Sequence, residues 1–551
     1  MPASKIYRSN YPRPHVPTNL SISQYLQLYN PDDAAADKTI FQDDWTGKSL
    51  TYSGLRTQSA KGAFGLRQLL NLEEGGVVLI CAPNSVDVVL LIHAVLWCGG
   101  TAVLVNPLST SYEVAHCLGI SEPKILVADS STWPTLFTAS QTVPAAGTFA
   151  TLSLDAGPCP FPSAIRLPQI FQTNNALPPL DLSERDSRDY TACVCFSSGT
   201  SGKAKGVELS HYNLVASMAG IRSSDTTLWN ETIRQVFFAP LCHIYGLVSA
   251  ALMGASIGYY TMLMKKYTLG RLLELSAKVN ANTLRILPTI AVAITKDHGF
   301  DLAQLQSIKL IMCAGATLPP KIIEFFNQRF PGAPIFQGYG MTETNITTLR
   351  PEQAHMIGSV GKLFANLEAR LVDDDMNDVE FGEEGEMLLR GPTVFRRYMK
   401  NQAATDETFH EGWMKTGDIL RSDENGFFYL TERKKELIKY KGNQVAPAEL
   451  EAYLGGHPYV RECAVCALWD EDQGTEVPIA YVVLTDEGRA ASENIASTLA
   501  EIQKHVDSKV SPYKKLRGGV VALDEIPKTG TGKVLRRLLP ARLAKERSSK
   551  L

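Results

Sequence analysis

Residues 192–207 read ACVCFSSGTSGKAKGV, an apolar run that passes directly into a loop rich in glycine and hydroxyl side chains. Glycines let the backbone fold tightly and turn its N–H groups inward, and Lys203 and Lys205 add positive charge at the same place. The loop differs from the Walker motif, because no glycine stands five residues before Gly202-Lys203. The pattern predicts a grip for a polyphosphate such as ATP, although many Ser/Gly-rich stretches are simply flexible surface loops.

Apolar, β-branched runs alternate with stretches of helical length on both sides of this loop. They occupy residues 76–81, 124–128, 192–196, 284–287, 308–313 and 334–337. Such alternation is typical of parallel sheets whose two faces are covered by helices. Ligands bind such sheets at the carboxyl ends of strands, where both the phosphate loop and residues 337–343 stand. The sequence therefore predicts an α/β fold with its functional loops at one edge.

The sequence pattern of the chain changes after about residue 350. Residues 351–430 contain short strands separated by Gly/Asp/Asn turns, which favour a small β-barrel-like unit. From Arg433 onward the charge density rises, and the runs 460–468, 477–484 and 518–523 supply strands for a compact α+β unit. We expect a new domain to begin there.

Bulk composition limits the classes of partner. The chain has 551 residues with 54 basic and 57 acidic side chains, so its net charge of -3 provides no global attraction for nucleic acid or anionic membranes. The longest apolar stretch, residues 88–105, is interrupted by His93 and by Gly99-Gly100. We interpret it as a buried helix, a turn and a buried strand, and we expect no membrane span. The polar, proline-dotted N-terminus does not resemble a secretion signal.

Four further motifs follow the phosphate loop in a fixed order. They are QGYGMTE at 337–343, TGD at 416–418, ERKKELIKYKGNQVAP at 432–447 and PKTGTGK at 527–533. With these motifs the chain resembles the adenylate-forming superfamily of acyl-CoA synthetases, 4-coumarate-CoA ligases and beetle luciferases. The resemblance extends from about Leu50 to Arg537. In character the chain is most similar to a peroxisomal 4-coumarate-CoA ligase-like acyl-CoA synthetase.

The resemblance implies a layout of two parts. Residues 1–432 would form an N-terminal adenylation domain, with sheet subdomains at about 1–190 and 191–350 and a β-barrel-like unit at 351–432. Residues 433–551 would form a small, mobile C-terminal lid domain. The implied enzyme is an AMP-forming acid–thiol ligase that uses ATP, Mg²⁺ and coenzyme A. Acid and ATP would give acyl-AMP and pyrophosphate, and coenzyme A would then displace AMP to give acyl-CoA.

The first half-reaction brings a carboxylate against the α-phosphate, and these two anions repel each other. A cation must therefore stand between them, and Lys533 in its glycine-flanked loop matches the family's adenylation lysine. Glu343 should hold Mg²⁺, a hard ion that prefers oxygen ligands, and Thr342 should donate to the α-phosphate. For the thioester step, the resemblance assigns catalytic positions to Lys439 and Gln444. Without the resemblance, the lysines of 434–441 would be a solvated charge run.

The remaining nucleotide contacts also come from the resemblance. Asp418 would accept hydrogen bonds from the ribose hydroxyls, Arg433 would reach the same sugar, and Tyr339 would stack on adenine. The full expected nucleotide- and CoA-binding set is Ser197, Ser198, Gly199, Thr200, Ser201, Gly202, Lys203, Lys205, Gly315, Ala316, Gln337, Gly338, Tyr339, Gly340, Met341, Asp418, Arg433, Lys441 and Gly442.

The acyl pocket is expected around residues 240–249. His243 aligns with the histidine of the acid pocket in these ligases, where it would also serve catalysis, although a lone histidine is more often structural. The resemblance gives the pocket as His243, Tyr245, Ser249, Gly315, Gly340 and Ile346. None carries a carboxylate that could hold an ammonium group. We therefore expect an apolar aryl acid, similar to cinnamate or phenylacetate, or a medium-chain aliphatic acid.

Two alternative functions are compatible with the same fold, and the C-terminus carries a targeting signal. A luciferase-like oxygenase would share the fold, but Cys242 stands where luciferases have the first of two adjacent histidines. A catalytically silent scaffold would have no need for Glu343, Asp418 and Lys533 together. The final tripeptide, Ser549-Lys550-Leu551, matches the signal read by the peroxisomal import receptor, so the expected location is the peroxisome.

Overall fold

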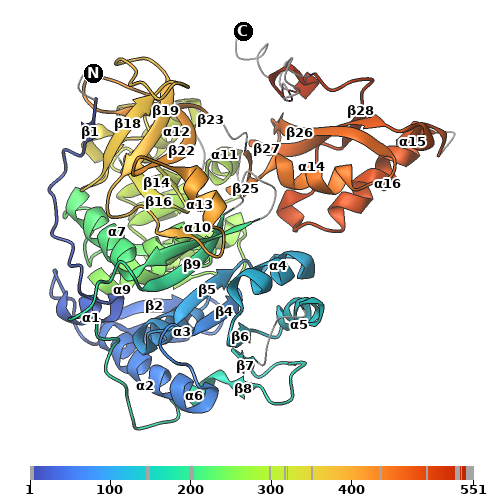
Figure 1. The fold of residues 1–551 in the computed structure, drawn as a ribbon. Coiled ribbons are helices and arrows are strands. Elements are labelled where there is room, and N and C mark those ends of the chain that lie inside the picture. Colours follow the sequence, from blue (N-terminus) through green and yellow to red (C-terminus); the bar gives the residue numbers. More distant parts are fainter. Residues whose placement is uncertain are drawn as a thin grey trace.

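The structure is a computed structural model, and it describes most of the chain. The described residues are 5–143, 149–197, 204–296, 299–314, 318, 320–348, 351–433, 437–491, 494–527, 534 and 536–541. Figure 1 shows a large body that contains the chain up to about residue 433, with a smaller unit of residues beyond about 437 beside it. The α/β class predicted from the sequence is confirmed.

The first sheet has eight strands with a parallel centre. In spatial order they are β20 (Arg397–Tyr398), β10 (Lys205–Ser210), β9 (Thr191–Ser197), β5 (Thr101–Val105), β4 (Val77–Cys81), β6 (Ile125–Ala128), β7 (Ala150–Ser153) and β8 (Ile165–Arg166). Only β10 and β20 run antiparallel to their neighbours. The phosphate loop leaves β9 and re-enters at β10, so it lies at the carboxyl end of a central strand.

Helices cover both faces of this sheet. One layer contains α2 (Tyr52–Leu70), α3 (Val86–Cys98) and α6 (Leu167–Phe171), and the other contains α4 (Ser111–Ser121) and α5 (Trp133–Thr142). Along β4, Val78 and Ile80 pack in the first layer, while Leu79 and Cys81 pack in the second. Successive side chains of a strand point to opposite faces, so burial of both faces requires the continuous apolar runs seen in the sequence.

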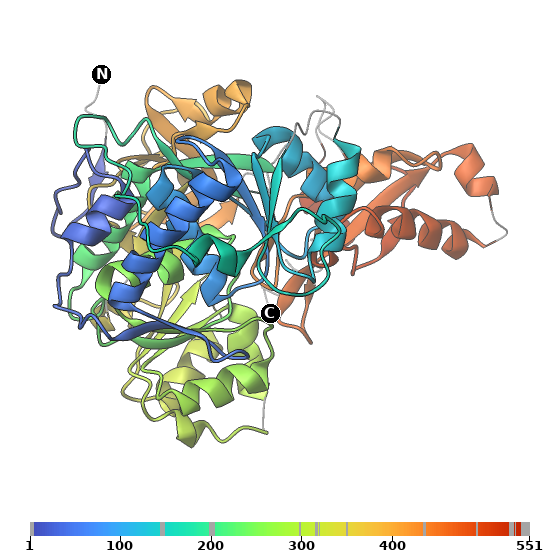
Figure 2. The same cartoon turned by 90° about the horizontal axis from the view of Figure 1, so that it is seen from below.

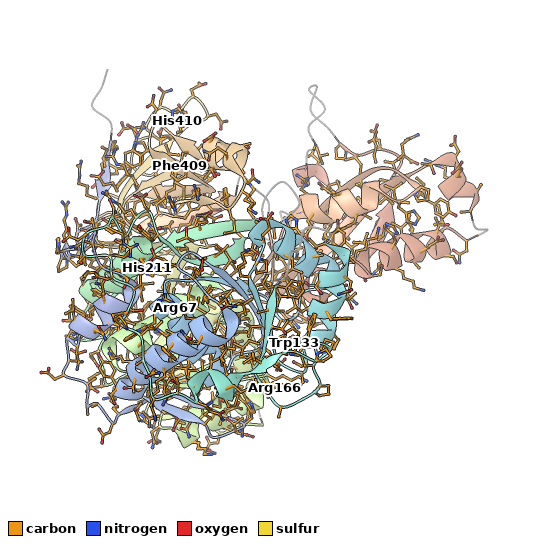
Figure 3. All side chains as sticks on the ribbon, turned by 60° about the horizontal axis from the view of Figure 1, so that its bottom comes forward. Arg67, Trp133, Arg166, His211, Phe409 and His410 are labelled. Carbon is orange, nitrogen blue, oxygen red and sulfur yellow. The ribbon has the colours of Figure 1, made fainter. Side chains whose placement is uncertain are left out.

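The outer edge of the first sheet is closed by polar contacts. The Ser153 hydroxyl accepts a hydrogen bond from Trp133 Nε1 at 3.1 Å and another from Arg166 Nη1 at 2.9 Å. Figure 3 labels both of these side chains at the end of the sheet away from the centre of the molecule. A buried tryptophan N–H needs such a partner, and Ser153 supplies it.

The second sheet has nine strands. In spatial order they are β17 (Lys362–Leu363), β16 (Thr344–Thr348), β15 (Ile335–Met341), β14 (Leu310–Ala314), β13 (Thr283–Ile286), β11 (Arg234–Phe237), β12 (Tyr260–Leu263), β2 (Thr39–Asp43) and β3 (Ser49–Thr51). The strands from β15 to β2 are parallel. Leu284, Ile286, Ile311 and Cys313 pack against α10 (Leu269–Lys278), α11 (Pro288–Lys296) and α12 (Pro320–Arg329). The alternate residues of these strands therefore face the interior of the large body.

The interior is completed by helices between the two sheets. These are α1 (Ile22–Leu28), α7 (His211–Ser224), α8 (Ile244–Gly246), the π-helix η1 (Leu247–Leu252) and α9 (Met253–Ile257). Short 3₁₀ turns occur at η2 (Leu302–Leu305) and η3 (Pro351–Gln353). The His211 imidazole, labelled in Figure 3, accepts a hydrogen bond from the Ile22 backbone at 3.1 Å and joins α1 to α7.

A third, antiparallel sheet stands where the sequence predicts a barrel-like unit. Its order is β1 (Tyr7–Arg8), β18 (Glu368–Val372), β19 (Gly385–Arg390), β22 (Trp413–Ser422) and β21 (Phe409–His410), with β23 (Phe428–Arg433) also paired to β22 and α13 (Gln402–Thr408) beside it. Over the described residues this order has two free ends, so the sheet is open rather than a closed barrel. Its first strand comes from the N-terminus of the chain.

The C-terminal unit is a small α+β structure. It contains the hairpin β24 (Ile438–Tyr440) and β25 (Asn443–Val445) and the sheet β26 (Val460–Asp470), β27 (Thr475–Leu484) and β28 (Val520–Ala522). Its helices are α14 (Pro447–Gly455), α15 (Asp486–Ala490) and α16 (Ile495–Asp507), with 3₁₀ turns η4 (Pro512–Lys514) and η5 (Arg536–Leu538). Figure 2, seen from below, also places this unit beside the large body, on the side of α4 and α5.

The predicted helix, turn and strand at residues 88–105 are confirmed. Helix α3 ends at Cys98, Gly99 takes the left-handed conformation with φ 85°, and β5 begins at Thr101. Glycine adopts this conformation without steric cost, which is why the apolar run breaks there. Among the described residues, no helix combines the length and apolar character that crossing a membrane requires.

Candidate active site

One large cavity lies where the carboxyl ends of both central sheets meet the C-terminal unit. Its volume is about 1660 Å³. Its walls include Phe196 and Ser197 at the end of β9, Met312–Ala314 at the end of β14, and residues 338–342 at the end of β15. Segments at the carboxyl ends of strands from both sheets therefore line one space, which is where ligands bind parallel sheets.

Glu343 lies behind this wall in a small polar cluster. The side chain is only 5% exposed, and its Oε1 accepts hydrogen bonds from Ser197 Oγ at 3.0 Å and from the Tyr398 hydroxyl at 2.8 Å. Burial, followed by the Glu343 charge, raises the pKa of Tyr398, so the phenol stays a donor. Lys205 Nζ lies 4.7 Å from the centroid of the Tyr398 ring. A carboxylate and a lysine are thus held beside the start and end of the phosphate loop.

Tyr339 and Asp418 form a second polar pair. The Tyr339 hydroxyl donates to Asp418 Oδ2 at 2.5 Å, and both side chains are buried. Tyr339 lines the cavity, whereas Asp418 stands behind it on β22. Across β22 and β23 the backbone pairs Asp418 with Arg433, the other residue expected at the ribose. The fold therefore joins Tyr339 to Asp418 across 79 positions of sequence and pairs the Arg433 backbone with the Asp418 backbone.

The remaining residues of the 337–343 motif divide into two groups. Gly338, Gly340, Met341 and Thr342 line the cavity. Gln337 does not, because its amide oxygen accepts a hydrogen bond from the Leu318 backbone at 2.7 Å. Gln337 thus fixes the neighbouring segment rather than facing the cavity.

The predicted acyl-pocket segment forms another wall. His243, Tyr245 and Ser249 all line the cavity, with the Tyr245 ring packed on Phe237 at a centroid distance of 5.7 Å. His243 precedes α8, and Ser249 lies in the π-helix η1, whose wider turn is often found at functional sites. Burial lowers the pKa of His243, so the imidazole is neutral at neutral pH.

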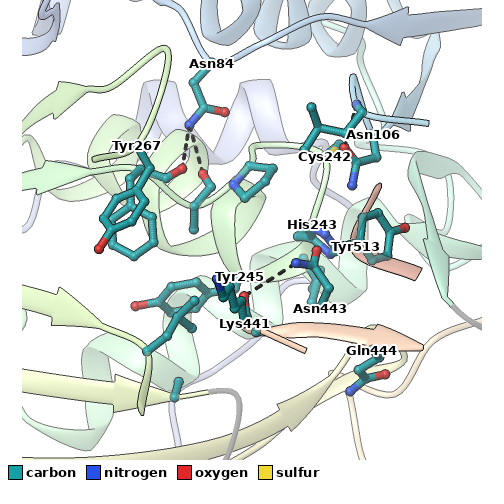
Figure 4. A pocket seen from close by; sticks show the side chains of 18 of the residues that line it. Asn84, Asn106, Cys242, His243, Tyr245, Tyr267, Lys441, Asn443, Gln444 and Tyr513 are labelled. Atoms are coloured by element: carbon teal, nitrogen blue, oxygen red, sulfur yellow. Dashed lines mark hydrogen bonds between the residues drawn. The ribbon is translucent and has the colours of Figure 1, made fainter. Parts of the chain in front are cut away.

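The hairpin of the C-terminal unit provides the opposite wall. Figure 4 shows Lys441, Asn443 and Gln444 beside the segment that carries His243 and Tyr245. The turn is formed by Lys441 and Gly442, with φ 47° and 81°, and Lys441 N donates to Thr475 Oγ1 at 2.9 Å. Lys439 pairs with Gln444 across the hairpin, but it is not among the residues that line the cavity.

Several predicted site residues lie outside the described part of the chain. They are Ser198, Gly199, Thr200, Ser201, Gly202, Lys203, Gly315, Ala316, Lys533 and the terminal Ser549-Lys550-Leu551, together with the side chains of Ile346 and Arg433. The residues on either side of Lys533 that are described, Ile526 and Val534, pack with Tyr481 on the sheet of the C-terminal unit.

Sequence reasoning missed a buried charge cluster that joins the two units. Lys514 Nζ contacts Glu113 Oε1 on α4 at 2.7 Å and Glu449 Oε1 on α14 at 2.8 Å. Burial disfavours the charged amine, but Tyr513, Glu449 and Glu113 together raise the pKa of Lys514. The Ser511 hydroxyl also donates to Glu113. No sequence motif marks these residues, because their spacing reflects contact between two units.

A second missed residue is Arg285 on β13. It lines the cavity and is 2% exposed, which is unusual for an arginine. The sequence offers a signal here, since a charged residue interrupts the predicted strand at 284–287, which is otherwise apolar. Such an interruption indicates either a paired structural charge or a ligand site.

Comparison with known proteins agrees with this geometry. The AMP-binding enzyme family matches residues 30–399, and the AMP-binding enzyme C-terminal domain matches residues 449–533. The chain is 33% identical over 510 residues to 4-coumarate–CoA ligase-like 3 of Arabidopsis thaliana, covering 91% of this chain and 89% of that protein. It is 32% identical over 546 residues to peroxisomal OPC-8:0-CoA ligase 1 of the same plant, covering 97% and 95%.

A solved relative has been captured with different ligands. The o-succinylbenzoate CoA synthetase of Bacillus subtilis is 26% identical, and as a double mutant bound to its product analogue OSB-NCoA it matches with a TM-score of 0.76 over 94% of this chain and 98% of that one. In complex with the acyl-adenylate intermediate OSB-AMP, the same synthetase matches with a TM-score of 0.63 over 94% and 97%.

The motifs, the shared cavity and the matched regions lead to one assignment. The chain belongs to the AMP-binding, adenylate-forming enzyme family, and it is an acid–thiol ligase of the acyl-CoA synthetase type.

Proposed function

We propose that the protein activates an apolar carboxylic acid, either aryl or medium-chain aliphatic, and transfers its acyl group to coenzyme A. Acid and ATP give acyl-AMP and pyrophosphate, and the CoA thiol then displaces AMP to form the thioester. The observation that carries this proposal is the single cavity of about 1660 Å³ shared by His243, Thr342 and the hairpin residues Lys441–Gln444. A site for two successive reactions needs room for nucleotide, acid and thiol.

The nucleotide roles follow the positions of the polar pairs. Tyr339 would face adenine, with Asp418 and Arg433 at the ribose, and Thr342 would donate to the α-phosphate. The phosphate loop 198–203 and Lys205 would hold the outer phosphates. Gly315 and Ala316 would complete the adenine and acyl walls. Gly315, Gly340 and Ile346 would line the acid pocket on the side opposite His243. Residues 1–432 would form the adenylation domain, and residues 433–551 would form the lid.

The two half-reactions would use two orientations of the lid. In this structure the hairpin faces the cavity, whereas Ile526 and Val534, which flank the Lys533 loop, pack on the lid's own sheet. This arrangement suits the thioester step, in which Lys439, Lys441, Gly442 and Gln444 would guide the thiol. The higher TM-score to the CoA-analogue complex of the Bacillus synthetase, 0.76 against 0.63, supports the same assignment.

Glu343 is our candidate ligand for Mg²⁺. Ser197 and Tyr398 both donate to Oε1, and Oε2 accepts no hydrogen bond from the described residues. One carboxylate beside a phosphate loop fits an ion that usually takes one or two carboxylates plus substrate phosphates. When bound, Mg²⁺ would neutralise charge on the departing pyrophosphate.

Replacing Glu343 with glutamine is expected to slow acyl-AMP formation by about 10²-fold, because the amide still accepts from Ser197 and Tyr398 but carries no charge. Pyrophosphate release measured over a Mg²⁺ titration checks this, with the exposed Glu411→Gln as a matched control. An unchanged rate and unchanged Mg²⁺ requirement would show that the carboxylate only supports the hydrogen bonds.

Replacing Lys514 with methionine is expected to slow thioester formation from supplied acyl-AMP about tenfold. Two buried carboxylates, Glu113 and Glu449, lose their shared cation, which disfavours the orientation in which the lid contacts α4. Acyl-AMP formation should be unchanged, since it would use the other orientation. Rapid-quench assays of each half-reaction separate the two rates, and Lys515→Met is the control. Equal slowing of both steps would contradict the expected role.

We also propose that the enzyme works in peroxisomes. The support is the terminal Ser549-Lys550-Leu551 and the relative named a peroxisomal CoA ligase. A fluorescent protein fused at the N-terminus should reach peroxisomes, and removal of the three residues should abolish that import. Persistent import of the truncated chain would contradict recognition of the tripeptide.

Mass spectrometry of CoA thioesters formed from a library of carboxylic acids tests the proposed activity. Acid-dependent exchange of pyrophosphate into ATP measures the first half-reaction alone. A folded protein that gives neither signal with any acid would support the scaffold alternative. Light emission with luciferin would instead favour the oxygenase.

A further inference from the structure

Arg285 is a buried cation in the wall of the cavity. The side chain is 2% exposed and lies on β13 between Leu284 and Ile286, both of which face α10–α12. Strand alternation therefore turns Arg285 to the opposite face, toward the interior of the large body, where it lines the cavity. Its placement in the wall is set by the strand rather than by a flexible loop.

The guanidinium group is only partly satisfied. Arg285 Nε donates to Gln235 Oε1 at 2.5 Å, and Gln235 is held in turn by its amide contact with Thr261 Oγ1 at 3.0 Å. Within the described part of the chain, Arg285 Nη1 and Nη2 are buried without any hydrogen-bond partner. Gln235 therefore holds the Nε side of the guanidinium, and the two terminal nitrogens donate no hydrogen bond to the described residues.

A second unused donor lies beside it. The Trp229 ring centroid is 4.9 Å from the Arg285 guanidinium carbon, and Trp229 Nε1 is likewise buried without a partner among the described residues. Both side chains line the cavity, together with apolar groups such as Ile221, Met312 and Tyr245. The Trp229 ring and the hydrogen bond from Nε to Gln235 hold the guanidinium on two sides.

An uncompensated charge in this position is costly. Arginine remains protonated in proteins, and a buried cation without a counter-charge is strongly destabilising. Four described carboxylates line the cavity: Glu113, Glu274, Glu449 and Asp472. Glu113 and Glu449 are both engaged by Lys514, whereas Glu274, which pairs with Arg271, and Asp472 are exposed. An anion that enters the cavity would supply the missing counter-charge, and the planar fork of arginine matches a carboxylate with two parallel hydrogen bonds.

We propose that the acid activated by this enzyme carries a second carboxylate, at the end remote from the reacting carboxyl group, which pairs with Arg285. The preferred substrate class is then a dicarboxylic acid with an apolar middle, whose far carboxylate accepts from Nη1 and Nη2 with Trp229 Nε1 beside it. This inference rests on the proposed acyl-CoA ligase function. The acid pocket is then apolar along most of its length, as expected from the sequence, and has the Arg285 cation at the end remote from the reacting carboxyl group.

The experiment compares three forms of each acid in a series of aliphatic and aryl-substituted chain lengths: the diacid, its mono-methyl ester and the equal-length monocarboxylic acid. The readout is kcat/KM for CoA-thioester formation. At the best chain length, the wild-type enzyme should prefer the diacid over the mono-ester by about 10–100-fold, the usual range for hydrogen bonds to charged groups. The mono-ester keeps the chain length and the far carbonyl group but replaces the negative charge with a methyl ester, and the equal-length monocarboxylic acid controls for the added methyl group.

Variants assign this preference to Arg285. Arg285→Met should bring the ratio of diacid to mono-ester close to one while the monocarboxylic acid is still converted, and Arg285→Lys should keep part of the preference. Arg234→Met is the matched control, because Arg234 is an arginine on the neighbouring strand that stacks on Tyr260 at 4.6 Å and does not line the cavity.

The outcomes separate two failures. A wild-type ratio near one at every chain length overturns the inference, even if monocarboxylic acids are good substrates, and so does a ratio that Arg285→Met leaves unchanged. Absence of thioester from every acid would instead contradict the proposed function. If Arg285→Met fails to fold, Arg285→Lys takes its place: a diacid preference that Arg285→Lys leaves unchanged would overturn the inference.

Discussion

Replacing Lys533 with alanine is expected to slow acyl-AMP formation by about 10²–10³-fold, the usual loss for one preorganised electrostatic contact in an active site. The lysine would stand between the carboxylate and the α-phosphate, two anions that must approach each other. The same variant should convert supplied acyl-AMP to the CoA thioester at a normal rate, because in the proposed scheme the hairpin residues 441–444, and not Lys533, serve that step.

Single-turnover assays of the two half-reactions measure this difference, with Lys528→Ala as a control in the same glycine-rich segment. Equal losses in both half-reactions would mean that Lys533 supports folding, or that the lid does not alternate between two orientations.

Replacing Gly442 with valine should have the opposite effect. Gly442 has φ 81°, and a Cβ at this position would lie 2.5 Å from Leu287 Cδ1 in the large body. Either the Leu287 side chain or the hairpin would then have to shift, and a displacement of about 1 Å at a reacting centre can cost 10²-fold. We expect thioester formation from supplied acyl-AMP to fall by about 10²-fold and acyl-AMP formation to be unaffected.

Gly519→Val is the matched control for this substitution. Gly519 has φ 82°, but a Cβ there would meet nothing within 4 Å. The two variants therefore share the backbone strain of a left-handed β-branched residue, and only Gly442→Val adds the collision. If both variants slow the thioester step equally, backbone strain in the lid explains the loss and the contact with Leu287 does not.

The parallel sheets were predictable from the sequence because burial of both faces leaves a local signature. Strands such as β4 and β5 are continuous apolar runs, and the glycine at position 99 marks the end of the helix before β5. Edge strands leave no such signature. The two-residue strand β1 joins the third sheet, and β2 and β3 join the second, although all three precede the first sheet in sequence. Such pairings depend on distant partners rather than local pattern.

The parts of the site that carry sequence motifs were predictable from the sequence. The parts that depend only on contacts between distant residues were not. Residues 338–342 and the segment around His243 line the cavity, because loops after parallel strands meet at one edge. The bonds from Ser197 and Tyr398 to Glu343 link residues 146 and 55 positions apart, which no spacing rule reveals. Arg285 was visible as a charge in an apolar strand, but its unsatisfied nitrogens require the packed structure.

The most direct measurement is a crystal structure with an unreactive acyl-AMP mimic. We expect the mimic in the large cavity, with adenine against Tyr339, its ribose near Asp418, its phosphate beside Thr342 and its acyl group toward His243. Density for the mimic at any place remote from these four residues would contradict the convergence of separate loops on one adenylating site, and with it the proposed function.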